Sequence, residues 1–283
     1  MRALQHCCSR NADAVKSDLV ETVYGDIRNP DTCLSICRGV DGVIHLAALI
    51  HVDDSRKVPR EYWDVNVGGT FNLLEGARLG GVKRFTYMST AERFGSVAPP
   101  MADDQTPVNA SSPYAASKYC AERYCVAYGL AYGMDLSIAI GFNVYGPRQR
   151  SGAKGAVVAT FVDRALRGED ITIYGGGTQT RDYTYVRDLA DGVARLHLSE
   201  KAKGETIILA SGVERRILDI TYAIFHLTGA KSRIVHVEGR PGENMRSCGN
   251  PDKAKRLLAW EADTPFQTGL AETIDYFKNL VKY

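Results

Sequence analysis

The chain has 283 residues, of which 45% are hydrophobic and 24% are charged, and its formal net charge at pH 7 is +2. These values are typical of a globular protein with a sizeable core, arranged as one large domain or two modest ones. Lys and Arg form no block, so the sequence gives no indication of nucleic acid or an anionic membrane as a partner. The longest apolar stretch, Val43–Ile50, is far too short to span a bilayer.

The seven cysteines favour neither a disulfide framework nor a metal site. They are odd in number, include no C-x-x-C pair and have no His-rich spacing beside them. The amino terminus lacks a charged start followed by an apolar run, so no signal peptide is predicted. We expect no metal ion and, by default, the reducing cytoplasm as the location.

In the first half of the chain, short β-rich runs alternate with helical patterns. β-branched and aromatic residues predict buried strands at Val20–Tyr24, Val43–Leu46, Arg84–Ser89 and Leu136–Ile140. Apolar residues that recur at spacings of three and four predict helices at Glu61–Leu79 and Pro113–Tyr132. This alternation predicts an α/β fold, in which helices cover both faces of a parallel sheet.

The pattern changes after residue 146, where shorter elements follow one another. We predict helices at residues 156–167, 186–199, 217–228, 251–259 and 268–278, and a strand at residues 171–174. We therefore expect a first domain over residues 1–146, to which a segment at about residues 182–210 returns. Residues 147–283 are expected to form a smaller, partly interleaved α/β domain over the carboxyl ends of the strands, where ligands bind in such sheets.

Two residues of the second predicted helix have the chemistry of a proton-transfer site. Tyr114 and Lys118 are four residues apart, so they project from one face of the helix. An ammonium beside a phenol favours the phenolate, so we expect Lys118 to lower the pKa of Tyr114 from its usual value of about 10. Such a tyrosine can take the proton of a substrate hydroxyl while a hydride leaves the same carbon. The alternative for this spacing is a surface pair without a function.

Seven segments, taken in order, carry a resemblance to a known family. They are GDIR at Gly25–Arg28, VIHLAA at Val43–Ala48, NVGGT at Asn66–Thr70, STAERFG at Ser89–Gly95, Tyr114 with Lys118, NVYGPRQ at Asn143–Gln149, and TRDY at Thr180–Tyr183. In order and separation they resemble the nucleotide-sugar epimerase and dehydratase branch of the extended short-chain dehydrogenase/reductase family. This resemblance implies a doubly wound Rossmann-type sheet that binds NAD(P) over residues 1–146 and a nucleotide-sugar substrate domain over residues 147–283.

The resemblance also implies roles for individual residues. The implied catalytic residues are Thr90, Tyr114, Lys118 and Glu92. The implied cofactor contacts are Asp26, Ile27, Leu46, Ala47, Ala48, Asn66, Ser89, Tyr114, Lys118, Phe142 and Val144. The implied substrate contacts are Thr90, Asn143, Arg148, Val157, Tyr174, Arg181 and Arg240, with Arg181 and Arg240 on the diphosphate.

Several of these residues have an alternative interpretation that the sequence leaves open. Asp26 can accept the amino hydrogens of an adenine ring, or it can be a turn residue at the end of a strand. Thr90 can bind the oxygen that is oxidised, or it can be a helix cap. Glu92 can be a base, or it can be an exposed carboxylate paired with Arg93. Tyr145 can line the site, or it can be a core tyrosine.

The glycine-rich turn that holds the pyrophosphate in dinucleotide-binding folds is absent from the sequence, which contains neither G-x-x-G-x-x-G nor G-x-G-x-x-G. Residues 1–4 resemble the family's second strand, so about thirty residues with a strand and a helix are expected to be missing in front, through truncation or a natural short form. The missing strand would lie between the second and fourth strands, which would then lack a neighbour. We therefore expect weak binding of NAD(P) or none.

The choice of cofactor also stays open. An acidic residue after the second strand would bind the adenosine ribose and favour NAD. Residues 5–10 contain no acid, and Arg10 is placed to meet a 2′-phosphate. The resemblance implies NAD, and NADP is not excluded.

Position 91 narrows the expected reaction. Dehydratases of this branch resemble Ser-Thr-Asp-Glu here, whereas this chain has Ala91 in place of the acidic residue and keeps Glu92. Loss of a general acid costs about 10²–10⁴ in rate, which argues against dehydration. We predict C4 epimerisation of a nucleotide-diphosphate sugar, with a UDP-sugar as first choice, through a 4-keto intermediate. Decarboxylation with Glu92 and 4,6-dehydration are the alternatives, and a non-catalytic sugar-nucleotide-binding remnant is the alternative of another class.

The resemblance further implies a homodimer. Members of the family pair two long helices across the dimer interface, and these correspond to the helices predicted at Glu61–Leu79 and Pro113–Tyr132.

Overall fold

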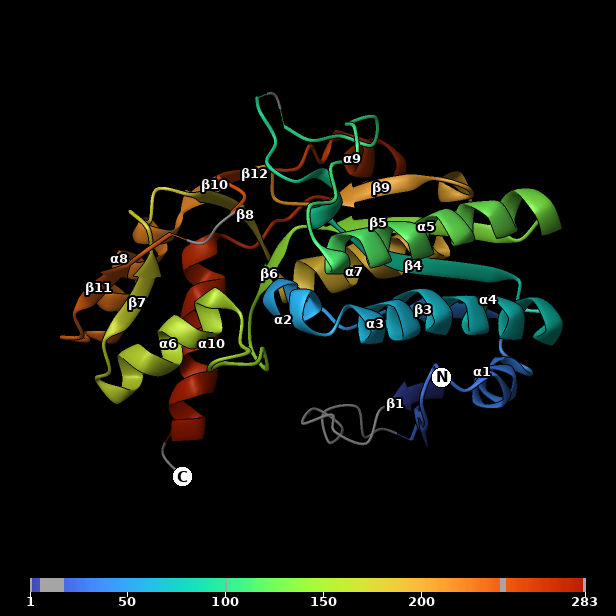
Figure 1. Ribbon diagram of the computed structural model, residues 1–283, viewed down its shortest axis with the longest axis horizontal. Coiled ribbons are helices and arrows are strands. Elements are labelled where there is room, and N and C mark those ends of the chain that lie inside the picture. The colour runs from blue at the N-terminus through green and yellow to red at the C-terminus, as the bar shows by residue number, and fades with distance from the viewer. Residues whose placement is uncertain (1, 6–17, 100, 240–242, 282–283) are drawn as a thin grey trace. The chain divides into compact units, whose positions relative to one another are not determined.

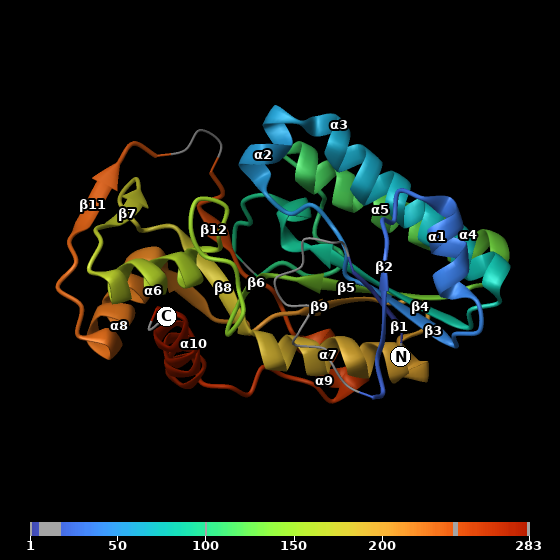
Figure 2. The ribbon, with the colours of Figure 1, turned by 90° about the horizontal axis from the view of Figure 1, so that it is seen from below.

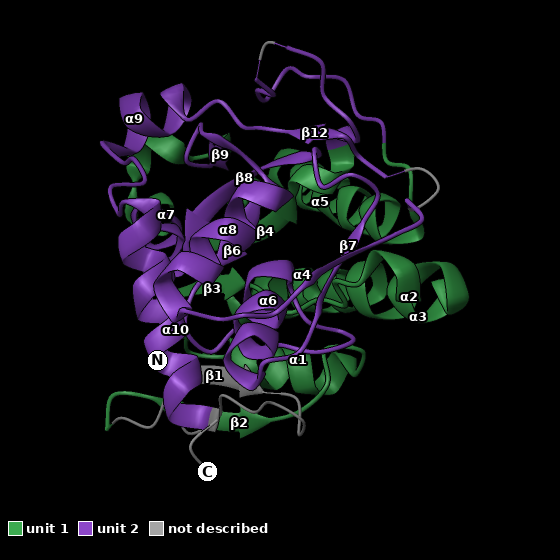
Figure 3. Ribbon diagram, turned by 90° about the vertical axis from the view of Figure 1, so that its left-hand side faces the viewer, with its two compact units in different colours: residues 1–93, 110–139, 196–207 green, residues 94–109, 140–195, 208–283 purple. Residues whose placement is uncertain are grey.

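A computed structural model describes residues 2–5, 18–99, 101–239 and 243–281. The chain forms two compact units (Figure 3). Unit 1 contains residues 1–93, 110–139 and 196–207, and unit 2 contains residues 94–109, 140–195 and 208–283. Within the described residues, the helices are too short or too polar for any of them to cross a membrane.

Unit 1 is built on two separate groups of strands (Figure 1). β1 (Arg2–Gln5) and β2 (Glu21–Tyr24) form a parallel pair. The second group is a four-stranded sheet in the order β3 (Gly42–His45), β4 (Arg84–Thr90), β5 (Asp135–Gly141), β9 (Thr206–Leu209). β3 and β4 are parallel, with Gly42 opposite Arg84 and His45 opposite Tyr87. The predicted α/β fold with parallel strands is confirmed.

The division between these groups leaves β3 at the end of its sheet. Among the described strands, none joins β1 to β3, which is where the sequence predicts a missing strand. Val20–Tyr24 and Val43–Leu46 are therefore not the buried strands that the sequence predicts: Ile44 is 42% exposed, Leu46 61%, and Tyr24 is exposed as well. An apolar strand is buried only when neighbours cover its faces and its edge, and β3 lacks such a neighbour on one side.

The helices of unit 1 are α1 (Pro30–Cys37), α2 (Val52–Lys57), α3 (Pro59–Tyr62), α4 (Gly69–Gly80) and α5 (Pro113–Tyr132). α5 has the predicted bounds, and its local sequence explains both ends. The Ser112 side chain accepts a hydrogen bond from the backbone N–H of Ala115 at 3.1 Å, and Pro113 occupies the first turn. Gly133 takes a left-handed conformation and ends the helix.

The predicted helix at Glu61–Leu79 is interrupted by a π-helical turn at Trp63–Gly68. Asn66 holds this turn in place: its Oδ1 accepts from the Leu49 N–H at 2.8 Å, and its Nδ2 donates to the Leu49 carbonyl at 3.0 Å and to Ser117 Oγ at 2.9 Å. An apolar repeat of three and four residues does not distinguish a π-turn from an α-helix, so the sequence pattern could not locate the interruption.

Unit 2 contains two further groups of strands (Figure 2). β8 (Thr180–Tyr185) pairs in parallel with β6 (Asn143–Tyr145) and β12 (Arg246–Ser247), and antiparallel with β10 (Glu214–Arg216). β7 (Ile171–Tyr174) and β11 (Ile234–Val237) form a parallel pair. The helices are α6 (Val157–Arg167), α7 (Val186–Leu198, whose last residues belong to unit 1), α8 (Ile217–Thr228), α9 (Asp252–Leu258) and α10 (Phe266–Val281).

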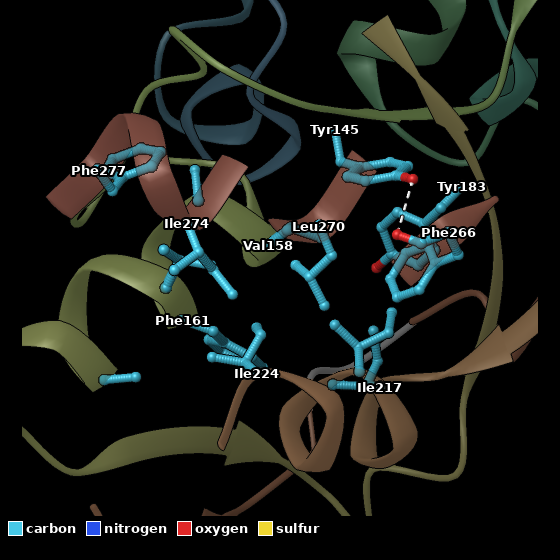
Figure 4. Close-up of a cluster of buried hydrophobic side chains, with 14 of the residues drawn as sticks. Tyr145, Val158, Phe161, Tyr183, Ile217, Ile224, Phe266, Leu270, Ile274 and Phe277 are labelled. Atoms are coloured by element: carbon cyan, nitrogen blue, oxygen red, sulfur yellow. Dashed lines mark hydrogen bonds between the residues drawn. The ribbon is translucent and has the colours of Figure 1, made fainter. Parts of the chain in front are cut away.

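The core of unit 2 lies among α6, α8 and α10 (Figure 4). Phe161, Ile224, Leu270 and Ile274 from these helices are buried together. Tyr145 is buried among them, and its hydroxyl donates to the Phe266 carbonyl at 3.2 Å. Tyr145 is therefore the core tyrosine that the sequence offered as the alternative to a site residue.

The packing of α4 on α1 generates a test of the fold. A Cβ atom at Gly76 would lie 2.7 Å from the carbonyl oxygen of Cys33, so Gly76→Ala forces backbone apart. We expect it to lower the free energy of unfolding by at least about 1 kcal/mol in urea denaturation. Gly68→Ala is the matched control, because its Cβ meets nothing closer than the Trp63 carbonyl at 3.9 Å. Equal effects of the two variants would contradict this account.

Candidate active site

One buried face of α5 carries three ionisable side chains. Tyr114, Lys118 and Glu122 are spaced four residues apart and are 7%, 4% and 1% exposed. This face packs on β4, which ends at Thr90. The interpretation of Tyr114 and Lys118 as a surface pair is therefore wrong, because neither side chain reaches solvent.

The ammonium of Lys118 lies against an aromatic ring. Its Nζ is 4.2 Å from the centroid of the Tyr87 ring, and the Tyr87 hydroxyl donates to the Lys118 carbonyl at 3.1 Å. Burial lowers the pKa of Lys118 to about 7, and the charge of Glu122 acts in the opposite direction. Lys118 therefore titrates near neutrality, although a lysine in water remains charged there.

The pKa of Tyr114 moves in the direction opposite to the one expected from the sequence. Burial raises it to about 12, a hydrogen bond with Thr90 acts to lower it, and the charge of Glu92 raises it further. The expected lowering by Lys118 is wrong because removal of the phenolate from water dominates, and Lys118 is not among the groups that shift the pKa of Tyr114. Tyr114 is thus a phenol at neutral pH.

The four predicted catalytic residues lie together in unit 1. Thr90 is the last residue of β4, and it lies close enough to Tyr114 to lower the pKa of the Tyr114 phenol. Glu92 follows in the short 3₁₀ turn Ala91–Phe94, and its backbone N–H donates to Thr90 Oγ1 at 3.3 Å. The charge of Glu92 acts on Tyr114, and Lys118 lies one helical turn beyond it. The arrangement offers one phenol and one hydroxyl at the same point, with a carboxylate beside them.

Two residues of this site were missed by the sequence analysis as functional groups. The Oε2 of Glu122 accepts from Ser89 Oγ at 2.7 Å, and its Oε1 accepts from Arg93 Nη1. Arg93, which the sequence offered as a surface partner of Glu92, is buried and forms an ion pair with Glu122. Glu122 follows Lys118 by four residues, so the sequence could have predicted that it lies on the same face of the helix.

The predicted cofactor residues are distributed over both units. In unit 1, the Asp26 carboxylate accepts from the backbone N–H and the guanidinium of Arg28, so in this structure it acts as the turn residue that the sequence offered as an alternative. Ile27 and Ser89 are buried, Leu46 and Ala47 are exposed, and Ala48 is half-buried. In unit 2, Phe142 stacks on Phe94 with ring centroids 6.5 Å apart, and the Val144 carbonyl accepts from the side chain of Gln149.

The residues of unit 1 fit the reacting end of a dinucleotide and do not fit its pyrophosphate. Thr90, Tyr114 and Lys118 are the groups that such a cofactor and a substrate hydroxyl would meet. In the described parts of the chain, no strand runs into a helix through a glycine-rich turn, which is the usual seat of the diphosphate.

Unit 2 contains a cavity of about 560 Å³ between β6, α6, β7 and β8. Four predicted substrate residues line it: Asn143, Val157, Tyr174 and Arg181. Arg181 Nη2 lies 3.8 Å from the Glu243 carboxylate, also in the cavity wall. Arg148 is exposed in a left-handed conformation with φ 68° and does not line the cavity, and Arg240 lies outside the described residues.

Comparison with known proteins identifies the family. A sequence model described as GDP-mannose 4,6 dehydratase matches residues 2–273. The chain is 35% identical to a UDP-glucose 4-epimerase of Mycolicibacterium smegmatis, over 94% of this chain and 85% of that protein. It is 34% identical to a UDP-N-acetyl-alpha-D-glucosaminuronate decarboxylase of Bacillus cytotoxicus, over 85% of this chain and 77% of that protein. The chain belongs to the nucleotide-sugar epimerase and dehydratase family.

Solved structures of this extended short-chain dehydrogenase/reductase family share its Rossmann-type fold. The UDP-glucose 4-epimerase of Thermotoga maritima, solved with UDP-glucose, matches 99% of this chain and 91% of its own, with a TM-score of 0.94 and 27% identity. The dTDP-glucose 4,6-dehydratase DesIV of Streptomyces venezuelae, solved with NAD bound, matches 95% and 83%, with a TM-score of 0.90 and 31% identity. Members of the family are NAD-dependent enzymes, and the predicted recognition, fold class and enzyme class are confirmed.

The site residues allow a prediction of how tightly the protein binds NAD or NADP. Because the described strands offer no glycine-rich turn, we expect titration of the purified protein with NAD or NADP to show no saturation at micromolar concentrations. Isothermal calorimetry measures this directly, and Lys118→Met serves as the control for contacts at the reacting end. Micromolar or tighter binding of either nucleotide would contradict the expectation.

Proposed function

We propose that the chain interconverts C4 epimers of a nucleotide-diphosphate sugar, with a UDP-sugar as the first candidate, through a 4-keto intermediate. The observation that carries this proposal is that Thr90, at the end of β4, lies close enough to Tyr114 to act on the pKa of its phenol, at a position where Ala91 provides no second acid. Epimerisation at C4 needs a group that removes and returns one proton, whereas dehydration needs a further acid.

The residues of unit 1 would perform the proton transfer. Tyr114 Oη takes the proton of the C4 hydroxyl, and Thr90 Oγ1 holds the same oxygen during the reaction. NAD, when bound beside Tyr114 and Lys118, would supply hydride chemistry at C4. Tyr114 must first pass its own proton to the neutral amine of Lys118, one helical turn away; burial of the phenol opposes this loss, and the ammonium so formed favours the phenolate. Tyr114 would then return the proton to the oxygen that Thr90 holds, which completes its part of the reaction.

The two units would divide the binding work. We propose that unit 1 corresponds to the NAD-binding domain expected over residues 1–146 and that the cavity of unit 2 takes the nucleotide. Arg181 supports this assignment, because a guanidinium in the cavity wall can pair with two phosphate oxygens at once.

Decarboxylation of a nucleotide-sugar acid is the second candidate. The charge of Glu92 reaches Tyr114, so a carboxylate is close to the point where the sugar would be oxidised. One of the similar proteins is a decarboxylase of a UDP-sugar acid. Decarboxylation would use Glu92 as a base beside the 4-keto sugar, whereas C4 epimerisation needs no such base.

Product analysis tests these candidates. The purified protein is incubated with UDP-glucose, UDP-N-acetylglucosamine and UDP-glucuronate, with NAD at millimolar concentration because binding at micromolar concentration is not expected, and products are separated by chromatography. We expect an epimer, and we expect Tyr114→Phe to reduce its rate by at least about 10²-fold. Tyr132→Phe, at an exposed position near the end of the same helix, is the matched control.

Other outcomes of this experiment are equally distinct. Release of CO2 from UDP-glucuronate would favour decarboxylation, and a 4-keto-6-deoxy product would favour dehydration. No turnover of any of the three, with a thermal shift by sugar nucleotide alone, would replace the enzyme proposal with a non-catalytic binding protein.

We further propose a homodimer formed by α4 and α5, which lie side by side (Figures 1 and 2). Aromatic side chains of both helices are partly exposed and touch each other: the Phe71 ring is 6.1 Å from the Tyr124 ring, edge to face. Exposed aromatic clusters of this kind are typical of protein interfaces.

The dimer proposal is tested by light scattering during size-exclusion chromatography. We expect the unmodified protein to elute as a dimer and Phe71→Asp to convert it to a monomer, because a carboxylate in an apolar interface is not solvated. Tyr222→Asp, at an exposed aromatic position on α8, should leave the mass unchanged. A monomeric unmodified protein would refute the proposal.

A further inference from the structure

The carboxylate of Glu122 is fully engaged inside unit 1. One oxygen accepts from Ser89 Oγ at 2.7 Å and the other from the guanidinium of Arg93, and both Glu122 and Arg93 are buried. The Arg93 guanidinium also lies over the Tyr119 ring, with its carbon 4.9 Å from the centroid. Such a buried ion pair is strongly disrupted when one partner is removed, because the other charge is left without compensation.

The two partners of Glu122, Ser89 and Arg93, lie on either side of the site residues Thr90 and Glu92 in the sequence. Ser89 is directly before Thr90, and Arg93 is directly after Glu92. Glu122 itself lies one helical turn beyond Lys118 and two beyond Tyr114. One carboxylate therefore joins both ends of the segment Ser89–Arg93 to the helix face that carries the proton-transfer residues.

We propose that Glu122 and Arg93 are positioning residues that hold Thr90 and Glu92 against Tyr114. Neither is assigned contact with substrate or cofactor. The inference deepens the proposed function and rests on it, since positioning matters for a reaction in which Thr90 and Tyr114 share one substrate oxygen. Ser89 takes part as the hydroxyl that donates to Glu122, which gives it a role other than the cofactor contact expected from the sequence.

The same carboxylate, one helical turn from Lys118, acts to raise the pKa of that lysine. The groups that face Lys118 are His45 from β3, Tyr87 from β4, and Tyr114, Glu122 and Cys125 from α5. Burial lowers the pKa of His45 to about 3 and raises the pKa values of Tyr87, Tyr114 and Cys125, so all four are uncharged at neutral pH. Glu122 is the carboxylate in this set, and its charge favours the ammonium of Lys118.

The first experiment measures the titration of Lys118 in the unliganded protein. Nuclear magnetic resonance of protein with isotope-labelled lysine, in which the Lys118 Cε signal is followed between pH 6 and pH 10, gives the midpoint at which its ammonium loses the proton. We expect Glu122→Gln to move this midpoint to lower pH, because the amide keeps the shape and loses the charge. We expect Glu122→Asp, which keeps the charge, to leave it near that of the unmodified protein.

Glu75→Gln is the matched control for this measurement. Glu75 is paired with Arg78 on α4, so its loss also breaks an ion pair, but one that does not act on Lys118. A folded Glu122→Gln protein with an unchanged Lys118 midpoint overturns the inference. If Glu122→Gln does not fold, Arg93→Met decides: it leaves the Glu122 charge without its partner and should move the midpoint to higher pH, and a lower or unchanged midpoint overturns the inference.

The second experiment separates position from charge in the reaction. With NAD in excess and the best UDP-sugar, we expect Glu122→Asp to lower kcat by about 10²-fold, because the shorter side chain does not reach Ser89 and Arg93 together. KM should change by less than about threefold, since Glu122 binds no substrate. An unchanged kcat for Glu122→Asp refutes the positioning role. If the unmodified protein turns over no sugar, the proposed function fails, and backbone hydrogen exchange of the segment Ser89–Arg93 decides the positioning role: exchange should rise in Glu122→Asp, and unchanged exchange overturns the inference.

Discussion

Burial of one face of α5 against β4 is the constraint on which the chemistry of this protein depends. It places Tyr114, Lys118 and Glu122 in a medium where charge is costly, and it shifts the pKa of the tyrosine up and that of the lysine down. The charge state of the site is therefore set by desolvation first and by neighbouring charges second. Glu122 can stay in this interior only because Ser89 and Arg93 occupy both of its oxygens, so packing and polar pairing are inseparable here.

The division of the sheet in unit 1 affects a different part of the molecule. β3 has an open edge with exposed apolar side chains, and β1 pairs only with β2 among the described strands. β4, by contrast, has a neighbour on each side and carries Thr90 at its end. The proton-transfer residues are held by interior elements, whereas the place where a dinucleotide diphosphate would be seated falls at the division.

The sequence predicted what is decided locally. Ser112, Pro113 and Gly133 define the ends of α5, and the order of the motifs identified the family and the Tyr114–Lys118 pair. The π-turn at Trp63–Gly68 was not predictable from periodicity, because it depends on bonds from Asn66 to Leu49. The pairing of Arg93 with Glu122 joins residues 29 positions apart, and the pKa of Tyr114 depends on burial. These features appear only when distant segments pack together.

Glu92 is the residue whose charge bears most directly on the choice of reaction. Its carboxylate raises the pKa of Tyr114, so it opposes the phenolate that a simple epimerase needs. A site that used only Tyr114 and Thr90 would gain nothing from this charge. In one case, Glu92 acts as a base toward a sugar-acid substrate. In the other, the ammonium of Lys118 compensates the negative charge of Glu92. The second case makes Glu122 more important, because its charge keeps Lys118 protonated close to neutral pH. The charges of Glu92, Lys118 and Glu122 therefore bear on which reaction the site performs. Glu122 contributes to both the charge of Lys118 and, through Arg93, the position of the site residues.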